Sequence, residues 1–319
     1  MLASTAVIDF EIGWLGQITR NQTFMRTTIH SFRNLWDSSG PRCFMLLLPL
    51  VFLLSCTRAP QPKSGPPQRI ISIVPSVTEM LFAFGLGDKV IGVSDFDHFP
   101  PEVETRTRVG GLINPDIEKI ITMSPDLVIT YGTQDTLRQQ LESAGIPIFP
   151  YVHGNVEQTL NFMLDLGHAV GAEDRARQTV EELRRTFQQV RARAPAAAPK
   201  VLLIYGREAG TLGSFYSAGR RAFQHDLIEM AGGRNLFDDV DQETVQPTLE
   251  EVISRRPDII VETLSPPLKP AEVQQRENDW NRLGLAKGRI YIEGESYFLI
   301  PGPTLGMAAE RMSRIIRGE

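Results

Sequence analysis

The sequence predicts an α/β protein made of two Rossmann-like lobes with mostly parallel sheets, joined by a single long α-helix. Three observations predict this architecture: a charged segment with one narrow apolar stripe, a second segment that occurs twice at a fixed distance, and strand patterns that alternate with helix patterns on both sides of the charged segment. Such alternation is typical of sheets whose strands run parallel.

The linking helix is predicted at Glu173 to Arg193, a segment without Gly or Pro. At ~1.5 Å per residue it spans roughly 32 Å, about the width of a small domain. Pro195 and Pro199 follow and end the helix. Apolar residues recur at steps of four, three, four and three, which places one stripe on a polar rod: Ala176, Val180, Leu183, Phe187 and Val190.

The repeated segment occupies residues 114–129 and 246–261, which lie 132 positions apart (246 − 114). In both copies a Glu stands near the start of a helix pattern, and a Pro-Asp pair precedes a strand pattern. A β-branched strand pattern also precedes each copy, at 69–74 and 200–205. Internal repetition of this kind predicts two halves that are built alike.

In the first half, the strand at 69–74 leads into a helix in which Ser76 and Glu79 have the spacing of an N-terminal capping box. A helix that starts at the carboxyl edge of a parallel sheet marks the edge where α/β folds bind ligands. The other expected elements are strands at 90–93, 127–130 and 147–151, and helices at 117–123, 137–144 and from 156 onward.

The second half is expected to begin with the strand at 201–205, followed by a polar, aromatic loop at 214–220. A helix at 223–230 is closed by Gly232 and Gly233. After the repeated segment, a Pro-rich loop leads to a strand at 289–293, and the last amphipathic helix covers 305–316.

The amino-terminal region differs from the rest of the chain. Phe44 to Ser55 is a nearly continuous apolar run that is too short to span a bilayer, for which ~20 residues are needed, so it fits the core of an export signal. The residues Leu53-Leu54-Ser55-Cys56 resemble the bacterial lipobox, which predicts a lipid on Cys56. A non-lipidated signal or a short anchor is the alternative. Translation from Met25 would give a signal of ordinary length, so residues 1–24 are expected to carry no fold information.

The chain is therefore divided into five parts. Both cysteines, Cys43 and Cys56, fall in the export segment or at its end, so we expect no disulfide in the folded part. The parts are an export signal at 1–55, a flexible tether at 56–68, an N-terminal lobe at 69–172, the linking helix at 173–194 and a C-terminal lobe at 195–319.

Composition and motifs exclude several function classes. The formal net charge of −5 argues against a nucleic-acid binder. The sequence contains no dinucleotide-binding turn, P-loop, nucleophile elbow or zinc-protease motif. We therefore expect a binding protein and no enzyme. The rivals from other classes are a two-lobed α/β enzyme, such as a glycosyltransferase or a chelatase, and the input domain of a two-component sensor.

Aromatic residues on the expected loops come from both halves and would line a groove between the lobes, although packing in the lobe cores is the alternative for each. They are Phe96, Tyr131, Tyr151, Tyr216, Tyr297 and Phe298. Arg207 and Arg220 are loop charges that could meet a ligand carboxylate or phosphate, with a solvated surface position as the alternative. The predicted ligand set is Phe96, Tyr131, His153, Arg207, Tyr216 and Tyr297.

Two histidines of the first half are the candidates for a metal site. His98 and His153 both fall on loops at the expected ligand-binding edge. Together they could bind free Zn or Mn, which makes a free-metal carrier the rival within the binding class. No resident metal or cofactor is otherwise expected.

Glu118 and Glu250 occupy equivalent positions of the repeated segment, near the start of a helix in each half. The helix dipole alone favours an acid there. The duplication, however, places one acid on each lobe, so a twofold-symmetric partner with basic pockets could receive both.

With these residues in view, the chain resembles the helical-backbone periplasmic binding proteins of ABC importers, the group of vitamin B12, ferric siderophore and haem carriers. The resemblance covers nearly all of residues 69–316 and rests on Arg69 to Glu79, Ile91 to Ser94 with Pro100-Pro101, Ile117 to Ile129, Gly232 to Phe237 and Leu249 to Asp258. It implies a monomeric carrier of the periplasm or cell envelope, anchored by its lipid, that holds a metal chelate between two lobes. It also implies delivery to a permease dimer with a cytoplasmic ATPase, docked through Glu118 and Glu250.

The chain departs from the vitamin B12 carriers where tryptophans are expected to pack on the corrin ring. Leu112-Ile113 and Thr244-Val245 stand at those positions. The sequence therefore leaves cobalamin or another corrinoid, a ferric siderophore and haem open as ligands.

Overall fold

The computed structural model describes residues 65–208, 210–264 and 269–319. Every element named below lies in these ranges. The expected export signal and Cys56 lie outside them, and the limits of the predicted domains stay a prediction.

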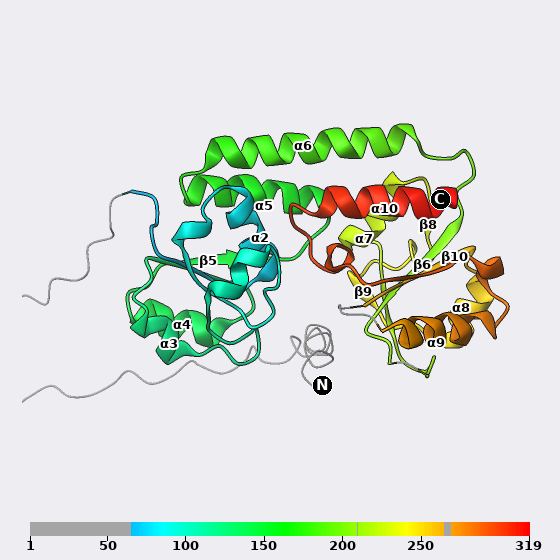
Figure 1. Ribbon diagram of the computed structural model, residues 1–319, viewed down its shortest axis with the longest axis horizontal. Coiled ribbons are helices and arrows are strands. Elements are labelled where there is room, and N and C mark those ends of the chain that lie inside the picture. Colours follow the sequence, from blue (N-terminus) through cyan, green and yellow to red (C-terminus); the bar gives the residue numbers. More distant parts are fainter. Residues whose placement is uncertain (1–64, 209, 265–268) are drawn as a thin grey trace, which may run out of the picture. The chain divides into compact units, whose positions relative to one another are not determined.

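The first sheet contains five parallel strands in the order β3-β2-β1-β4-β5. Its central strands are buried on both faces, which suits their β-branched sequences. The strands are β1 (Ile70–Ser72), β2 (Val90–Val93), β3 (Thr107–Arg108), β4 (Leu127–Tyr131) and β5 (Ile148–Tyr151). The helices of this half are α2 (Pro75–Ala83), α3 (Ile117–Thr122), α4 (Asp135–Ser143) and α5 (Val156–Ala169), with α3 against α4 (Figure 1).

The second sheet has the order β11-β10-β6-β7-β9, and β8 also pairs with β6. Its pairings are parallel except for those of β7, which runs antiparallel to β6 and to β9. The strands are β6 (Lys200–Tyr205), β7 (Tyr216–Ala218), β8 (Arg234–Asn235), β9 (Thr244–Val245), β10 (Ile259–Thr263) and β11 (Ile290–Glu293). The helices are α7 (Phe223–Met230), α8 (Leu249–Arg255), α9 (Pro270–Asn281) and α10 (Leu305–Arg317).

Short 3₁₀ turns join some of these elements, at Gly87–Lys89, Pro101–Thr105, Ala286–Gly288 and Ser296–Phe298. Two α/β halves with separate, mostly parallel sheets confirm the predicted fold class.

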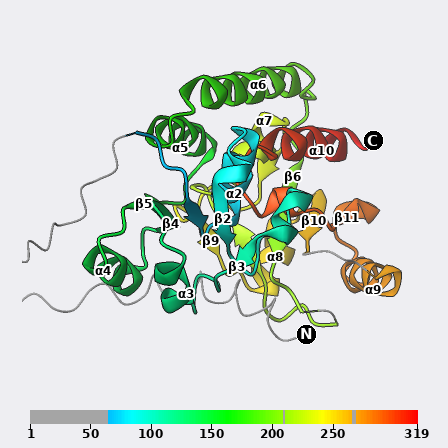
Figure 2. The ribbon, with the colours of Figure 1, turned by 60° about the vertical axis from the view of Figure 1, so that its left-hand side comes forward.

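The linking helix α6 (Glu173–Ala192) confirms the prediction to within one residue. Its buried residues are the five of the predicted stripe. The helix packs on α5 from the first half and on α7 and α10 from the second (Figure 2). Two ion pairs add to the packing, from Arg184 to Glu157 on α5 at 2.6 Å and from Arg193 to Glu310 on α10 at 2.5 Å. One continuous apolar core therefore runs from the first half through α6 into the second.

The duplication is visible in atomic detail. Asp126 accepts a hydrogen bond from the amide of Arg69 at 2.8 Å, and Asp258 accepts one from the amide of Lys200 at 2.9 Å. The residues before the two Pro-Asp pairs, Ser124 and Arg256, both have positive φ, 48° and 55°. The two copies thus end their helix and enter their strand in the same way.

Three local predictions were wrong. Residues Tyr216–Ala218, within the expected loop at 214–220, form strand β7. Residues 270–281 form α9, where a Pro-rich loop was expected, because Pro270 occupies the first turn of a helix, where its missing amide hydrogen costs nothing. Ser76 and Glu79 form no capping box, since α2 already begins at Pro75. The Glu79 carboxylate instead accepts a hydrogen bond from the Thr304 hydroxyl, just before α10, at 3.2 Å.

Candidate functional site

The carboxyl edge of the first sheet carries an aromatic cluster, which we define as Tyr131, Tyr151 and His153. Tyr131 stacks on His153 with 5.6 Å between ring centroids and 23° between ring planes. Tyr151 meets both rings edge-on, at 5.9 Å from Tyr131 and 5.0 Å from His153. Tyr131 and His153 are half-buried, whereas Tyr151 is buried. Two members of the predicted ligand set are therefore brought together.

Strand register explains this cluster. Tyr131 ends β4 and pairs with Tyr151, which ends β5. Gln134 fixes the following loop, because its side-chain oxygen accepts from the Tyr131 amide at 3.1 Å and its side-chain nitrogen donates to the Leu112 carbonyl at 2.7 Å. The rings are thus held by the sheet and by a braced loop.

Phe96 lies in the loop after β2, at the same edge. Its ring is half-buried and packs over the backbone of Gly111, where an added Cβ would come within 2.4 Å of the ring. The Asp97 carboxylate accepts from the Ser94 amide at 2.8 Å and from its hydroxyl at 2.5 Å. Burial raises the pKa of Asp97 above its usual range. The loop is therefore internally fixed and presents Phe96 from a defined position.

The second sheet carries an aromatic pair at the corresponding edge. Tyr216 begins the antiparallel strand β7 opposite Tyr205, which ends β6. The two rings stack at 6.3 Å with 23° between their planes. The Tyr205 hydroxyl lies 3.0 Å from the Thr244 hydroxyl. Sequence reasoning singled out Tyr216 but missed Tyr205; the available signal was its position as the last residue of a buried strand.

Arg207 does not occupy the exposed loop position that the sequence prediction assumed. Its side chain is fully buried. Its guanidinium donates to Glu262 at 2.9 Å through Nε and to Asp279 at 3.0 Å through Nη1. Glu262 also accepts from Trp280 Nε1 at 2.7 Å and from Arg276. This buried ion-pair cluster occupies the guanidinium, so we remove Arg207 from the ligand set. Arg220 is exposed and pairs with Asp241 at 3.3 Å.

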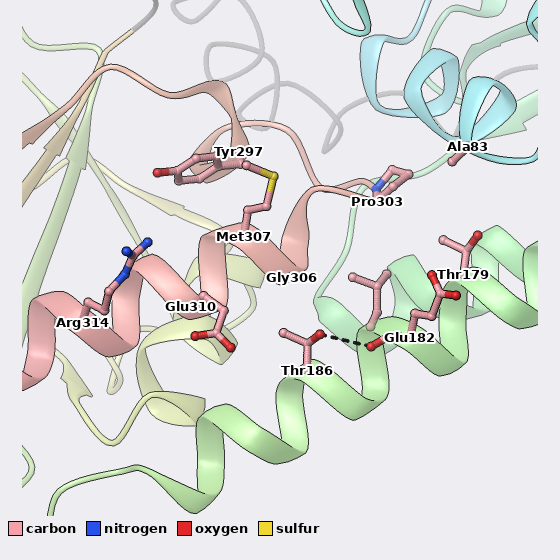
Figure 3. A pocket seen from close by; sticks show the side chains of 11 residues that line it. Ala83, Thr179, Glu182, Thr186, Tyr297, Pro303, Gly306, Met307, Glu310 and Arg314 are labelled. Carbon is pink, nitrogen blue, oxygen red and sulfur yellow. Dashed lines mark hydrogen bonds between the residues drawn. The ribbon is translucent and has the colours of Figure 1, made fainter.

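Tyr297, which follows β11, lines a groove between helices. The groove has a volume of about 600 Å³ and lies between α6, α10 and the end of α2 (Figure 3). Its lining includes Ala83, Thr186, Met307 and Glu310. Burial, with the nearby charges of Glu293 and Glu295, raises the pKa of Tyr297 to about 12. Tyr297 is therefore also removed from the ligand set.

The two histidines of the metal hypothesis have other neighbours. His98 is exposed, and its Nδ1 lies 3.1 Å from Glu104, whereas His153 belongs to the aromatic cluster. His98 lies in the loop after β2, and His153 lies in the loop after β5. Strands β1 and β4 stand between β2 and β5 in the sheet, so these two strands are roughly 14 Å apart at ~4.8 Å per strand. Within the described ranges, no group of three or more His, Cys, Asp or Glu is placed to hold a metal ion. The arrangement does not favour direct binding of a free metal.

Glu118 and Glu250 lie in the first turns of α3 and α8, and both are exposed. Each helix begins at a capping side chain: Asp116 accepts from the Lys119 amide at 3.0 Å, and Thr248 accepts from the Glu251 amide at 3.2 Å. In the part of the chain that the structure describes, neither glutamate has an ion-pair partner. Both acids are thus presented to solvent from short, well-capped helices.

Among the residues that the structure describes, no helix combines the length and the apolarity that a membrane span requires.

Comparisons with known proteins agree on one family. A family model described as periplasmic binding protein matches residues 70–279. The vitamin B12-binding protein of Photorhabdus laumondii is 29% identical over 248 residues, which are 77% of this chain and 86% of that protein. An uncharacterized ABC transporter substrate-binding lipoprotein of Bacillus subtilis is 28% identical over an alignment of 264 positions, which covers 78% of this chain and 80% of the relative.

Solved structures show the same fold. The apo form of a periplasmic haem-binding protein from Roseiflexus sp. RS-1 superposes with a TM-score of 0.67 at 24% identity, covering 80% of this chain and 99% of that chain.

Proposed function

The chain belongs to the periplasmic binding protein family, and we propose that it captures a metal chelate between its two lobes and delivers it to the permease of an ABC importer. The observation that carries this proposal is the pair of aromatic surfaces at the carboxyl edges of the two sheets, one in each half. This is the edge at which α/β folds bind ligands.

The ligand set we propose is Phe96, Tyr131 and His153 from the first half, with Tyr205 and Tyr216 from the second. Rings that stack in pairs offer flat, polarizable faces to a large planar or multidentate ligand. Such a ligand can be held by dispersion and hydrogen bonds alone, so no bond-making step is part of the proposed function.

The ligand class follows from the chemistry of these surfaces. Aromatic faces suit a metal that is already enclosed in an organic chelator, because they supply few ligands for a bare ion. Relatives named for vitamin B12 and a structural neighbour named for haem bind ligands of this class. Cobalamin or another corrinoid and a ferric siderophore are the leading candidates, and haem is the alternative.

The lipid anchor also belongs to the proposal. The apolar run that ends at Cys56 and the name of the Bacillus relative both support an exported lipoprotein. We expect labelled palmitate to appear on the wild-type protein in cells and not on Cys56→Ser; equal labelling of both would refute the anchor.

A binding screen tests the ligand assignment. The wild-type protein is titrated calorimetrically with cyanocobalamin, hemin and ferric complexes of a catecholate and a hydroxamate siderophore. We expect one of these to bind, and Tyr131→Ala and Tyr216→Ala each to weaken that binding by about tenfold, equivalent to ~1.4 kcal/mol for a lost aromatic contact.

Tyr297→Ala is the matched control, since this tyrosine lines the groove between α6 and α10. Its affinity should equal that of the wild type. Failure of every chelate to bind, or an equal loss in Tyr297→Ala, would contradict the proposal.

A further inference from the structure

The loop that carries Phe96 is held by a side chain from the neighbouring strand. Arg108 ends β3, where it pairs with Val93, the last residue of β2. Nη1 of its guanidinium donates to the Ser94 carbonyl at 2.8 Å and to the Asp97 carbonyl at 2.6 Å. These two carbonyls stand on either side of Phe96 in the chain, so the guanidinium closes the turn that contains the ring.

The guanidinium is itself fixed by an acid beyond the loop. Nη2 of Arg108 donates to the Glu104 carboxylate at 2.7 Å. Glu104 belongs to the 3₁₀ turn Pro101–Thr105 and also lies 3.1 Å from His98 Nδ1. The Arg108 side chain is 27% exposed, which limits the access of water to these hydrogen bonds. One fork of donors therefore joins β3, the loop and the turn that follows it.

Hydrogen bonds inside the loop do not replace this contact. The Phe96 amide donates to the Ser94 hydroxyl at 3.2 Å, and the Asp97 amide donates to the Ser94 carbonyl at 3.3 Å. Within the described chain, however, Arg108 supplies the one donor to the carbonyl of Asp97, a residue that is 1% exposed. A buried carbonyl that loses its donor is destabilised, and the loop would relieve this by moving toward water.

Phe96 depends on such a contact more than the other aromatic residues of the ligand set do. Tyr131 is placed by the ladder of β4, whereas Phe96 lies in a loop outside any strand. Both terminal nitrogens of Arg108 donate to groups of the protein, so its hydrogen bonds serve the loop.

We propose that Arg108 is a positioning residue for chelate binding, which holds residues 94–98 so that the Phe96 ring is in place before the chelate arrives. A contact that is already ordered adds to affinity because its ordering does not have to occur on binding. The inference rests on the proposed function, in which Phe96 contacts the chelate, and it assigns the group that prepares this contact.

A double-mutant cycle tests the assignment, with affinity measured calorimetrically for whichever of cyanocobalamin, hemin and the two ferric siderophores binds in the screen. Phe96→Ala should weaken binding by about tenfold. Arg108→Met, which removes the guanidinium, should weaken it by about fivefold, the cost of ordering one side chain and its loop. Added to Phe96→Ala, the same change should alter affinity by less than about twofold, because the ring through which it acts is absent.

Arg138→Met is the matched control in the same half. Arg138 is a surface arginine on α4 that pairs with Asp135 at 2.7 Å. Its replacement should leave the affinity of the wild type unchanged, and an equal loss in this variant would overturn the special role of Arg108.

The outcomes separate the inference from the proposed function. Wild-type affinity in Arg108→Met, with Phe96→Ala impaired, would overturn the positioning role and leave the proposed function intact. A full additional loss when Arg108→Met is added to Phe96→Ala would also overturn it, because the arginine would then act independently of the ring. Wild-type affinity in Phe96→Ala would overturn the inference and remove Phe96 from the ligand set, while binding through the other rings would stand.

A second measurement needs no chelate and reports on the loop directly. Hydrogen–deuterium exchange is followed by mass spectrometry in the ligand-free wild type, Arg108→Lys and Arg108→Met. Exchange at residues 94–98 should be fastest in Arg108→Met and intermediate in Arg108→Lys, which keeps the charge but has one nitrogen, whereas exchange in β4 should stay unchanged. Unchanged exchange at 94–98, or an equal acceleration in β4, would overturn the proposal.

Discussion

Arg207 shows how a single residue's role depends on a distant element. Its partner Asp279 lies on α9, 72 residues later in the chain. Sequence reasoning assigned that segment to a loop, so the arginine had no visible partner and was interpreted as a ligand contact. The structure shows that it joins the segment after β6 to β10 and α9.

Removal of Arg207 should therefore affect stability directly. Arg207→Ala removes the buried guanidinium that pairs with Glu262 and Asp279, and it leaves Arg276 as the remaining counter-charge of Glu262, which is 0% exposed. Breaking a buried pair in this way costs about 3–5 kcal/mol of the free energy of unfolding. Urea denaturation would measure the loss. Arg220→Ala, which alters an exposed arginine, is the control and should leave the unfolding midpoint nearly unchanged; a similarly small effect of Arg207→Ala would contradict a structural role.

Glu79 links protonation to the contact between the halves. It is buried on α2, and burial raises its pKa from 4.5 to about 8, with a smaller contribution from the nearby Asp97 and an opposing one from Thr304. The folded state therefore keeps a proton that the unfolded state releases above its pKa of 4.5. This stabilisation is complete below pH 4.5 and is lost as the pH rises toward about 8.

The corresponding prediction compares the wild type with Glu79→Gln, whose amide stays neutral. Between pH 5 and 8, the wild-type free energy of unfolding should fall relative to that of the variant, by at most about 1.4 kcal/mol per pH unit. Asp97 is present in both proteins, so the comparison isolates Glu79. Parallel stability curves for the two proteins would show that Glu79 is already charged at neutral pH.

At the scale of elements, periodicity was the reliable guide. The stripe of α6 was predicted residue by residue, because a long helix with one buried side leaves an unmistakable 3.6-residue pattern. Helix α9 was missed for two reasons. Pro270 was interpreted as part of a loop, although it begins the helix, and the buried side of the helix consists of the charged residues Arg276 and Asp279 together with Trp280. Apolar periodicity cannot reveal a helix that packs through ion pairs.

The packing of α6 leads to a prediction about motion. Since α6 packs along α5 in one half and α7 and α10 in the other, closure of the lobes would have to disrupt a continuous core. Ligand-free and chelate-bound protein should therefore give nearly superimposable small-angle X-ray scattering curves. A clear decrease in the radius of gyration on binding would show that the link is flexible.

At the scale of the whole molecule, the sequence revealed the two-lobed plan because the duplicated segment keeps its order of helix, Pro-Asp pair and strand. Tyr131 and Tyr216 were both expected on loops at the ligand-binding edge, whereas in the structure Tyr131 ends β4 and Tyr216 begins β7. Tyr205 was missed because the sequence of a strand does not show whether the ring of its last tyrosine faces the core or lies at the edge of the sheet. Tyr297 was misplaced because its turn precedes α10, whose packing on α6 the sequence does not specify.

The central claim is that one molecule both holds the chelate and presents paired acids to the permease. It is tested most directly by uptake of the identified chelate into proteoliposomes that contain the permease–ATPase complex, with chelate affinity measured in parallel. Glu118→Ala with Glu250→Ala should bind the chelate as tightly as the wild type and support no uptake, whereas Glu181→Ala, which alters an exposed acid on α6, should support normal uptake. Wild-type uptake by the double variant, or loss of its chelate affinity, would contradict the account.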